Sequence, residues 1–311
     1  MSIKTKLLTS AVALSMVAAM GIQSAKAEQL WDPYLRGVNE GLAAGALPPP
    51  GVYGVLNNYW ADYALYGANG KKVQNTHLTA LVEVPVVLWV PGIKVLGADY
   101  AAAAALPFDY TSFQGTQGLG HTGGGNLGLF NAVVVPGILS WALPDNFFVK
   151  TGLEFYLPTG TNSFKDLAEG KMNNGGLPSA MGFFAVQPDL GFSYLNGPWN
   201  LSAGFNVSFP VTDDKYNGIS YHSGDEFSAD YTAMYTMGKW AFGVGAEQQD
   251  QFTPDTMNGT NVHNEVHDFG MGPLVSYQLG TVNVLAEWNH GLVTQNQVAG
   301  DIFNIRLLTK F

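Results

Sequence analysis

The feature that most constrains this chain is an alternation of apolar and polar residues that runs for longer than a strand of a soluble sheet requires. From Trp199 to Val211, over thirteen residues, apolar side chains occupy every second position. Phe227 to Met237 repeats the pattern over eleven residues. Strands of globular sheets have about five or six residues, whereas a tilted strand needs about nine to eleven to cross a bilayer. The alternation therefore predicts membrane-spanning strands.

The composition agrees with strands that present one face to lipid and the other to a polar interior. Charged residues make up 12% of the chain and aromatic residues 13%, whereas soluble domains carry roughly twice that charged fraction. The mean hydropathy is only +0.07, because apolar and polar positions cancel along an alternating strand. The most apolar later stretch, Val84 to Ile93, is short and contains Pro85 and Pro91. Strands must therefore do the spanning, and they must close into a barrel to leave no backbone group unpaired in lipid.

The pattern as a whole predicts an all-β fold, an antiparallel transmembrane β-barrel of about twelve strands that occupies residues 51–311. We place the strands near residues 52–64, 76–89, 93–106, 126–142, 147–158, 183–195, 199–211, 226–237, 240–252, 266–279, 282–290 and 302–311.

Short and long connections alternate along this predicted barrel. The short ones are five tight turns at residues 90–92, 144–146, 196–198, 238–239 and 280–281. The longer, polar ones lie near residues 65–75, 107–125, 159–182, 212–225, 253–265 and 291–301. Outer-membrane barrels have short periplasmic turns and long external loops, so we expect an even number of strands and both termini on the periplasmic side.

The first 27 residues are typical of a secretory signal peptide. Lys4 and Lys6 precede the apolar run Leu7 to Met20, and Ala25-Lys26-Ala27 is an A-x-A cleavage site. A membrane-anchoring helix is the alternative, but the run is shorter than the roughly 20 residues that a span needs. We expect cleavage near Ala27, a mature chain that starts at Glu28, and a location in the outer membrane of a Gram-negative bacterium.

Charge and cysteine content exclude several classes of function. The formal net charge is −10, so nucleic acid is not an expected partner. The chain contains no cysteine and hence no disulfide framework and no thiolate metal site. His263, Glu265 and His267 form H-N-E-V-H rather than the zinc-protease motif H-E-x-x-H. We therefore expect no metal and no cofactor.

Residues 28–50 lack a strand pattern and form an N-terminal segment. Residues 32–44 are predicted to make a short helix with Asp32 as its N-cap and Pro33 as its first residue, and Pro48-Pro49-Pro50 would end it in a stiff, extended connection. A disordered periplasmic tail is one interpretation of the segment. The other is a plug or periplasmic gate of the barrel, built on the apolar side chains Trp31, Leu35, Val38 and Leu42.

Strand parity assigns most charged side chains of the membrane region to the lumen, because a Lys or Arg at the lipid midplane costs about 2–4 kcal/mol. A lined, acidic passage would favour neutral or cationic solutes over anions. The alternative, given equal weight, is that these charges pair with one another and simply fill the barrel. A barrel of twelve strands is intermediate in width between small barrels that side chains fill and large barrels that hold an open channel. The assigned residues are Glu83, Asp99, Lys150, Glu154, Asp189, Asp230, Glu247, Glu287, Arg306 and Lys310.

Aromatic residues near strand ends support a membrane location. Interfacial girdles of Trp and Tyr are typical of membrane proteins, and six such residues here have outward parity: Tyr194, Trp199, Tyr235, Trp240, Tyr277 and Trp288. The last strand also ends in an outward apolar row that resembles the assembly signal of bacterial barrels and would engage the barrel assembly machinery. That row consists of Phe303, Ile305, Leu307 and Phe311.

Three runs of sequence resemble one family. They are GALPPPGVYGVLNNYWADYALYGANG, SGDEFSADYTAMYTMGKWAFGVG and the closing GDIFNIRLLTKF. They are similar to the outer-membrane family named for the meta-pathway of phenol degradation. The resemblance implies a barrel that admits aromatic or other hydrophobic compounds. It carries over neither a particular substrate nor any catalytic residue.

The function predicted from these features is an outer-membrane channel or transporter for small hydrophobic or aromatic compounds, with lipid and a small solute as partners. A structural or adhesive barrel without transport is the main alternative. A lipid hydrolase is a weaker one, because Ser276, Asn289 and His290 lie on neighbouring predicted strands. A lipase nucleophile would have to face the bilayer, however, and parity turns Ser276 inward. The chain is therefore not expected to be an enzyme.

Overall fold

The computed structural model describes residues 32–73, 76–114, 125–161, 179, 181–216 and 218–311. No helix in this part of the chain is long and apolar enough to cross a membrane. The predicted signal peptide and Trp31 lie outside the described residues.

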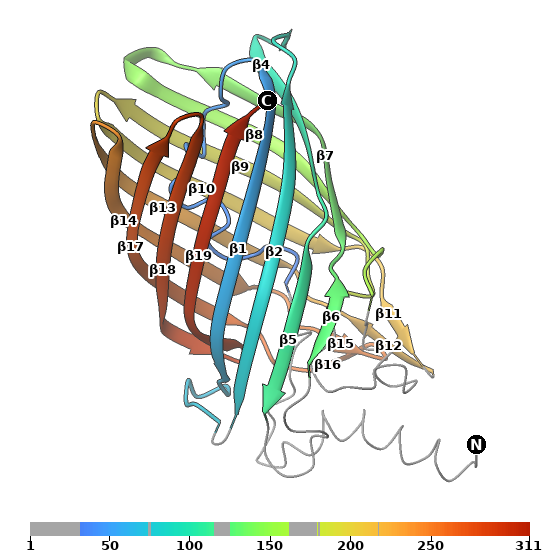
Figure 1. The fold of residues 1–311 in the computed structure, drawn as a ribbon. Helices are drawn as coiled ribbons and strands as arrows, with labels where there is room; N and C mark the ends of the chain where they lie inside the picture. The colour runs from blue at the N-terminus through green and yellow to red at the C-terminus, as the bar shows by residue number, and fades with distance from the viewer. Residues whose placement is uncertain (1–31, 74–75, 115–124, 162–178, 180, 217) are drawn as a thin grey trace.

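The described strands form one large antiparallel sheet that closes on itself (Figure 1). Its members are β1 (Gly51–Leu65), β2 (His77–Val90), β3 (Lys94–Val95), β4 (Ala98–Ala105), β5 (Phe108–Gln114), β6 (Asn126–Leu129), β7 (Ala132–Ala142), β8 (Phe147–Leu157), β9 (Ala185–Asn196), β10 (Trp199–Pro210), β13 (Glu226–Met237), β14 (Trp240–Gln251), β17 (His267–Leu279), β18 (Val282–Gln295) and β19 (Val298–Lys310).

The closure of the barrel follows from the pairing of its strands. β1 pairs with β19 on one side and with β2 on the other, so the first and last strands are neighbours. β2 pairs with both β4 and β5, which form one wall strand interrupted at Leu106-Pro107. β6 and β7 form another interrupted strand. With the short β3 left aside, the wall has twelve strands, and the prediction of a twelve-stranded antiparallel barrel is confirmed.

Two of the predicted connections are wrong in extent. β5 continues the third wall strand through Gln114, where a loop was expected from residue 107. β18 and β19 run to Gln295 and from Val298, so the loop predicted at residues 291–301 shrinks to a turn. The physical reasons differ. Leu106-Pro107 interrupts the third wall strand, and Phe108 and Tyr110 of β5 resume its outward apolar face after the break. At the ends of β18 and β19, a strand that continues beyond the lipid no longer needs apolar residues at alternate positions, so the sequence pattern fades before the ladder of hydrogen bonds does.

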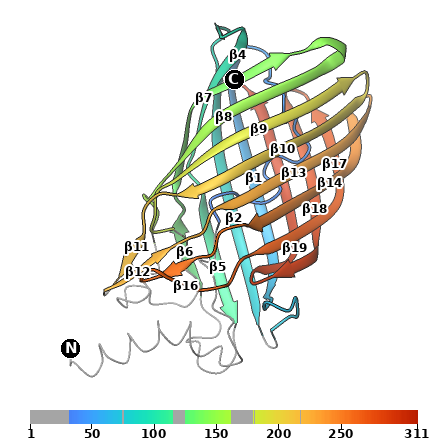
Figure 2. The same cartoon turned by 180° about the vertical axis from the view of Figure 1, so that it is seen from behind.

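The two ends of the barrel differ, as the connections predict. Tight turns with left-handed residues, among them Gly197, Gly238 and Gly280, join the strands at one end, which we call the short-turn end. The start of β1 and the C-terminus lie there too (Figure 1). The opposite, long-loop end carries a separate small sheet, visible at the foot of Figure 2. Its strands are β11 (Asp214–Tyr216), β12 (Ile219–His222), β15 (Thr256–Met257) and β16 (Thr260–Asn261).

The N-terminal segment, residues 32–50, runs inside the ring of strands in both views (Figures 1 and 2). Asp32 accepts a hydrogen bond from Gln297 at the long-loop end, 2.8 Å away. Pro50 lies next to β1 at the short-turn end. The segment therefore traverses the lumen lengthwise before it joins the wall.

The predicted helix over residues 32–44 is wrong. The backbone makes single turns instead, such as Val38 N to Leu35 O and Leu42 N to Asn39 O. Gly37 and Gly41 have left-handed φ angles of 75° and 77°, which interrupt a helix. Side chains of the barrel wall accept hydrogen bonds from the amides of Gly37, Asn39 and Gly41, which a helix would have bonded internally.

The two faces of the wall follow the predicted parity on β10 and β13. Phe205 and Phe209 lie on the outer face, where the Phe205 ring stands 6.1 Å from that of Tyr231. Asn206 and Asp230 are buried on the inner face. Near the short-turn end, outward aromatic rings pair across strands: Phe147 with Tyr194, Trp199 with Tyr235, and Trp240 with Tyr277. These pairs suit a membrane–water interface.

Arginine substitutions at two depths test the outer face. Phe205 lies in the middle of β10, whereas Val211 is exposed just beyond its end. Because arginine costs about 2–4 kcal/mol at the bilayer midplane and about 0–1 near the interfaces, Phe205→Arg should lower the free energy of unfolding by about 2–4 kcal/mol. Val211→Arg should have little effect. Urea titration of protein refolded in vesicles measures both, and equal losses would contradict this assignment of faces.

Candidate functional site

The inner face of the barrel binds the backbone of the N-terminal segment through a carboxylate. Asp230 of β13 accepts hydrogen bonds from the Tyr34 hydroxyl, from Gly37 N at 3.0 Å and from Asn39 N at 2.8 Å. All of these donors belong to the segment. A carboxylate that accepts several N–H groups replaces the hydrogen bonds that a helix would have formed.

An arginine four strands further along the wall, past β14, β17 and β18, binds the carbonyl oxygens of the same stretch. Arg306 of β19 donates to Val38 O at 2.7 Å and to Glu40 O. Its Nε donates to Asn57 Oδ1 at 2.7 Å. The wall therefore satisfies the donors of the segment with a negative group and its acceptors with a positive group. The fit depends on side chains from strands far apart in the sequence.

A second arginine lies on the segment itself. Arg36 forms an ion pair with Asp268 of β17 and lies 3.7 Å from Glu247 Oε2 of β14. It also donates to Val298 O at 3.0 Å and stands over the ring of Tyr63. These contacts hold the half of the segment nearer the long-loop end.

The part of the segment nearer the short-turn end is held by close backbone contact. Gly45 N donates to Ser193 Oγ, and Gly45 O accepts from Ser140 Oγ, each at 2.8 Å. A Cβ atom on Gly45 would collide with the backbone oxygen of Phe148, so only glycine fits. Lys310 Nζ donates to Pro50 O at 2.7 Å where the segment meets the wall.

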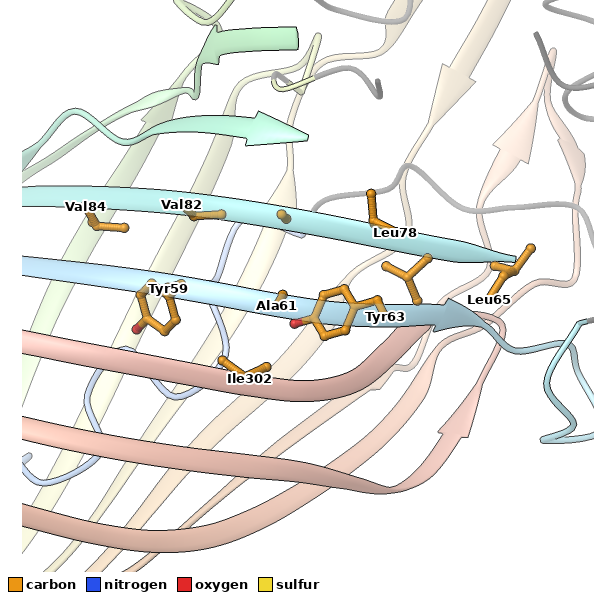
Figure 3. Close-up of a cluster of buried hydrophobic side chains, with 10 residues drawn as sticks. Tyr59, Ala61, Tyr63, Leu65, Leu78, Val82, Val84 and Ile302 are labelled. Atoms are coloured by element: carbon orange, nitrogen blue, oxygen red, sulfur yellow. The ribbon is translucent and has the colours of Figure 1, made fainter. Parts of the chain in front are cut away.

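On its other side the segment faces an apolar cavity of about 490 Å³. The wall opposite is formed by β1, β2, β4 and β7. Figure 3 shows part of this wall, with Tyr59, Tyr63, Val82 and Val84 among the buried side chains of β1 and β2. The main apolar lining residues of the wall are Val55, Val82, Val84, Val86, Leu88, Ala103, Ala105, Phe130, Val133, Val135 and Ile138.

The lumen is therefore divided into two chemically different halves. Polar and charged side chains, most of them from β9, β10, β13, β14, β17, β18 and β19, hold the segment on one side. Mainly aliphatic side chains line the cavity on the other side. Three of the apolar residues predicted for a plug line this cavity, namely Leu35, Val38 and Leu42. They cover the segment's surface toward the aliphatic wall.

The charged residues assigned to the lumen fall into three groups. Asp230, Glu247, Glu287 and Arg306 are buried around the segment. Lys150, Glu154 and Asp189 lie together at the β8–β9 edge of the cavity, where Lys150 Nζ is 3.5 Å from Asp189 Oδ1 and Glu154 accepts from the Tyr156 hydroxyl at 2.9 Å. Asp99 and Lys310 lie at the short-turn rim, where Asp99 pairs with Lys94 at 2.9 Å.

The assignment of Glu83 to the lumen is wrong. On β2 the even-numbered residues Val82 and Val84 are buried, and the exposed Leu81 and Val87 share the odd-numbered, outward face with Glu83. The register agrees, because Glu83 pairs with Asn58, on the outer face of β1. Parity fails here because β2 is apolar at nearly every position from Leu81 to Val90, so its alternation does not reveal which face is inside.

Several residues that bind the segment were missed. Asp268 and Asn289 lie on inward positions of β17 and β18, and parity would have found them. The part played by Arg36 and Tyr34 had no signal in the sequence, because it depends on where an irregular segment meets distant strands.

The outward apolar row of the last strand lies as expected from parity. Phe303, Ile305 and Leu307 are exposed on the outer face of β19, and Phe311 follows its end. Recognition of this row by the assembly machinery remains a prediction.

The residues of the lipid-hydrolase alternative do not form a site. Ser276 is buried on the inner face of β17, whereas His290 is exposed on the outer face of β18, 2.8 Å from Asp301. His267 likewise pairs with Asp250 at 2.9 Å on the outer face. Among the described residues, no group of three or more acidic or histidine side chains is arranged to hold a metal ion.

A closed twelve-stranded antiparallel wall with an apolar outer face defines an outer-membrane β-barrel. The family model for the MetA-pathway of phenol degradation matches residues 64–307. The chain belongs to this family, which confirms the resemblance read from its sequence.

A solved structure supports the fold. The COG4313 outer membrane channel from Pseudomonas putida F1 superposes with a TM-score of 0.73 at 16% identity, covering 90% of this chain and 100% of that one. The toluene transporter TbuX from Ralstonia pickettii gives a TM-score of 0.42 at 11% identity, over 85% of this chain and 90% of that one. The second similarity is too low to support an argument. No curated protein matches the chain.

Removal of the Asp230 carboxylate tests how the segment is held. Hydrogen bonds to charged groups contribute about 1.5–3 kcal/mol each, so Asp230→Ala should increase the undocked fraction of the segment by roughly tenfold or more. Thiol labelling of Leu42→Cys measures this in a chain without native cysteine. Asp99→Ala, which removes a carboxylate that pairs with the rim lysine Lys94, is the matched control. Equal labelling in both variants would contradict the assignment.

Proposed function

We propose that this protein passes small apolar compounds, including aromatic ones, across the outer membrane through the cavity between the N-terminal segment and the wall of β1, β2, β4 and β7. The observation that carries the proposal is the aliphatic lining of that cavity. Binding sites for apolar ligands are concave and mostly apolar, with a few polar groups at the edge. The family description, which refers to phenol degradation, supports the same class of compound.

The segment excludes water-soluble solutes by occupying the polar half of the lumen. An ion or sugar would have to displace the bonds that Asp230 and Arg306 make to its backbone. An apolar compound needs none of those groups, since it exchanges one aliphatic contact for another. Selectivity then comes from the division of the lumen, and the docked segment supplies one wall of the apolar route through Leu35, Val38 and Leu42.

The route to the membrane follows from the sequence. Residues 1–27 direct export and are removed after Ala27, which leaves Glu28 as the first residue. The outward row that ends in Phe311 directs insertion by the barrel assembly machinery. Mass spectrometry of protein from the outer membrane that found Met1 retained would contradict the first statement.

Filling the cavity tests the proposed route. Ala103 of β4 lines the cavity, whereas its neighbour Ala102 pairs with the outward residue Trp89. Ala103→Trp should slow the uptake of a monoaromatic hydrocarbon by several-fold, because the indole occupies the route, while Ala102→Trp adds an aromatic ring on the lipid side. Uptake of radiolabelled toluene into vesicles that contain equal amounts of folded protein measures both. Equal uptake by the two variants would remove the cavity from the route and leave a structural barrel as the better account.

Removal of the segment tests the exclusion of polar solutes. Deletion of residues 32–46 should raise single-channel conductance and sensitivity to large antibiotics, because an unfilled barrel of this width leaks small solutes. Planar-bilayer recording measures the conductance. Unchanged conductance in a deletion variant shown to assemble normally would mean that the segment does not exclude polar solutes.

A further inference from the structure

The segment carries one fully buried carboxyl group into the lumen. Glu40 is 0% exposed. Its Oε1 accepts a hydrogen bond from Asn289 Nδ2 at 2.7 Å. Its Oε2 has no hydrogen-bond partner among the described residues. That oxygen lies against Gly245 of β14, where any Cβ atom would collide with it, so the glycine makes room for the carboxyl group.

The charged groups that face Glu40 are mostly acidic. Asp230 of β13, Glu247 of β14 and Glu287 of β18 raise its electrostatic energy when it is ionised. The Tyr59 hydroxyl of β1 faces the same space and, like Oε2, has no hydrogen-bond partner in the described part of the chain.

Neither nearby arginine forms an ion pair with Glu40. Arg306 donates to the backbone oxygen of Glu40, not to its carboxyl group, and lies 3.9 Å from Glu287. Arg36 is engaged by Asp268 and Glu247. An ionised carboxylate buried without a positive partner costs several kcal/mol.

A bound proton removes this cost. The segment is not part of the membrane-spanning wall, and burial, together with the charges of Asp230 and Glu287, raises the pKa of Glu40 to about 10. A protonated carboxyl group can still accept the Asn289 hydrogen bond through its carbonyl oxygen. Asp230, by contrast, has partners for both carboxylate oxygens, since it accepts hydrogen bonds from one hydroxyl and two N–H groups of the segment.

We propose that Glu40 is a proton-binding site which forms when the segment docks, so that docking takes up a proton and rising pH releases the segment. This inference rests on the proposed exclusion of polar solutes by the segment. It adds that the exclusion is controlled by protons, and it assigns the control to one side chain.

The direction in which pH changes the stability of the docked segment follows from the linkage between proton binding and docking. A carboxyl group whose pKa is raised on docking stabilises the docked state fully below the ordinary glutamate value near 4.3. That contribution is lost progressively as pH rises toward the docked value of about 10. For the single proton that this proposal assigns to Glu40, the docking equilibrium constant falls by at most about tenfold per pH unit, or about 100-fold between about pH 6 and about pH 8.

Planar-bilayer recording of the full-length protein at these two pH values tests the proposal. The wild-type current should rise with pH. Glu40→Gln, which has the same shape and cannot ionise, should keep the low-pH current at both values. Glu40→Met should do the same, which covers the case in which the glutamine variant fails to assemble. Glu265→Gln removes a loop carboxylate and should retain the wild-type rise.

The deletion of residues 32–46 separates this proposal from the one on which it rests. If the deletion raises the current at low pH, and Glu40→Gln nevertheless retains the wild-type rise, the proton site is overturned and the exclusion stands. A wild-type current that does not change with pH overturns the proton site in the same way. If the deletion leaves the current unchanged, the exclusion itself fails.

Discussion

Every backbone amide and carbonyl within a bilayer must find a partner inside the protein, and the rest of the structure depends on how this chain meets that constraint. The wall meets it by closure, with β1 bonded to both β19 and β2. The N-terminal segment is neither strand nor helix and meets it differently. Asp230 accepts hydrogen bonds from amide groups of the segment, and Arg306 donates hydrogen bonds to its carbonyl oxygens. A buried carboxylate and a buried guanidinium are expensive in isolation, and each is here satisfied by the backbone of the segment.

This arrangement gives the lumen its division. Most of the buried polar side chains on the opposite part of the wall bind the segment, so the space that remains is mainly apolar. It lies between Leu35, Val38 and Leu42 on one side and the β1–β2–β4–β7 wall on the other, with Lys150 and Glu154 at its edge. The two interpretations of the lumen, a barrel filled by side chains and a passage for solute, are therefore compatible. Side chains and the segment fill the polar half, and an aliphatic cavity of about 490 Å³ remains in the other half.

The parts of the structure that could be predicted from the sequence are those in which apolar and polar residues alternate regularly. The wall was predictable because strands such as β10 alternate cleanly, and the same parity placed Asp230 and Arg306 on the inner face. Glu83 was misplaced because β2 is apolar on both faces, so neither face is marked by polar residues. The turns of the segment were not predictable, since they are stabilised by wall side chains more than 190 positions away rather than by local propensity. Glu40 was not singled out for the same reason: its burial is created by the wall.

The most direct measurement uses a disulfide between the segment and the wall. A Cβ atom at position 204 would lie 3.6 Å from that of Ala44, which suits a disulfide, and the chain has no native cysteine. With Ala44→Cys and Gly204→Cys oxidised, we expect a low ion conductance at every pH and unchanged uptake of a monoaromatic hydrocarbon, because the docked segment forms one wall of the proposed apolar route. Loss of hydrocarbon uptake on oxidation, restored by a reductant, would contradict this, because the segment would then have to leave before the compound could pass.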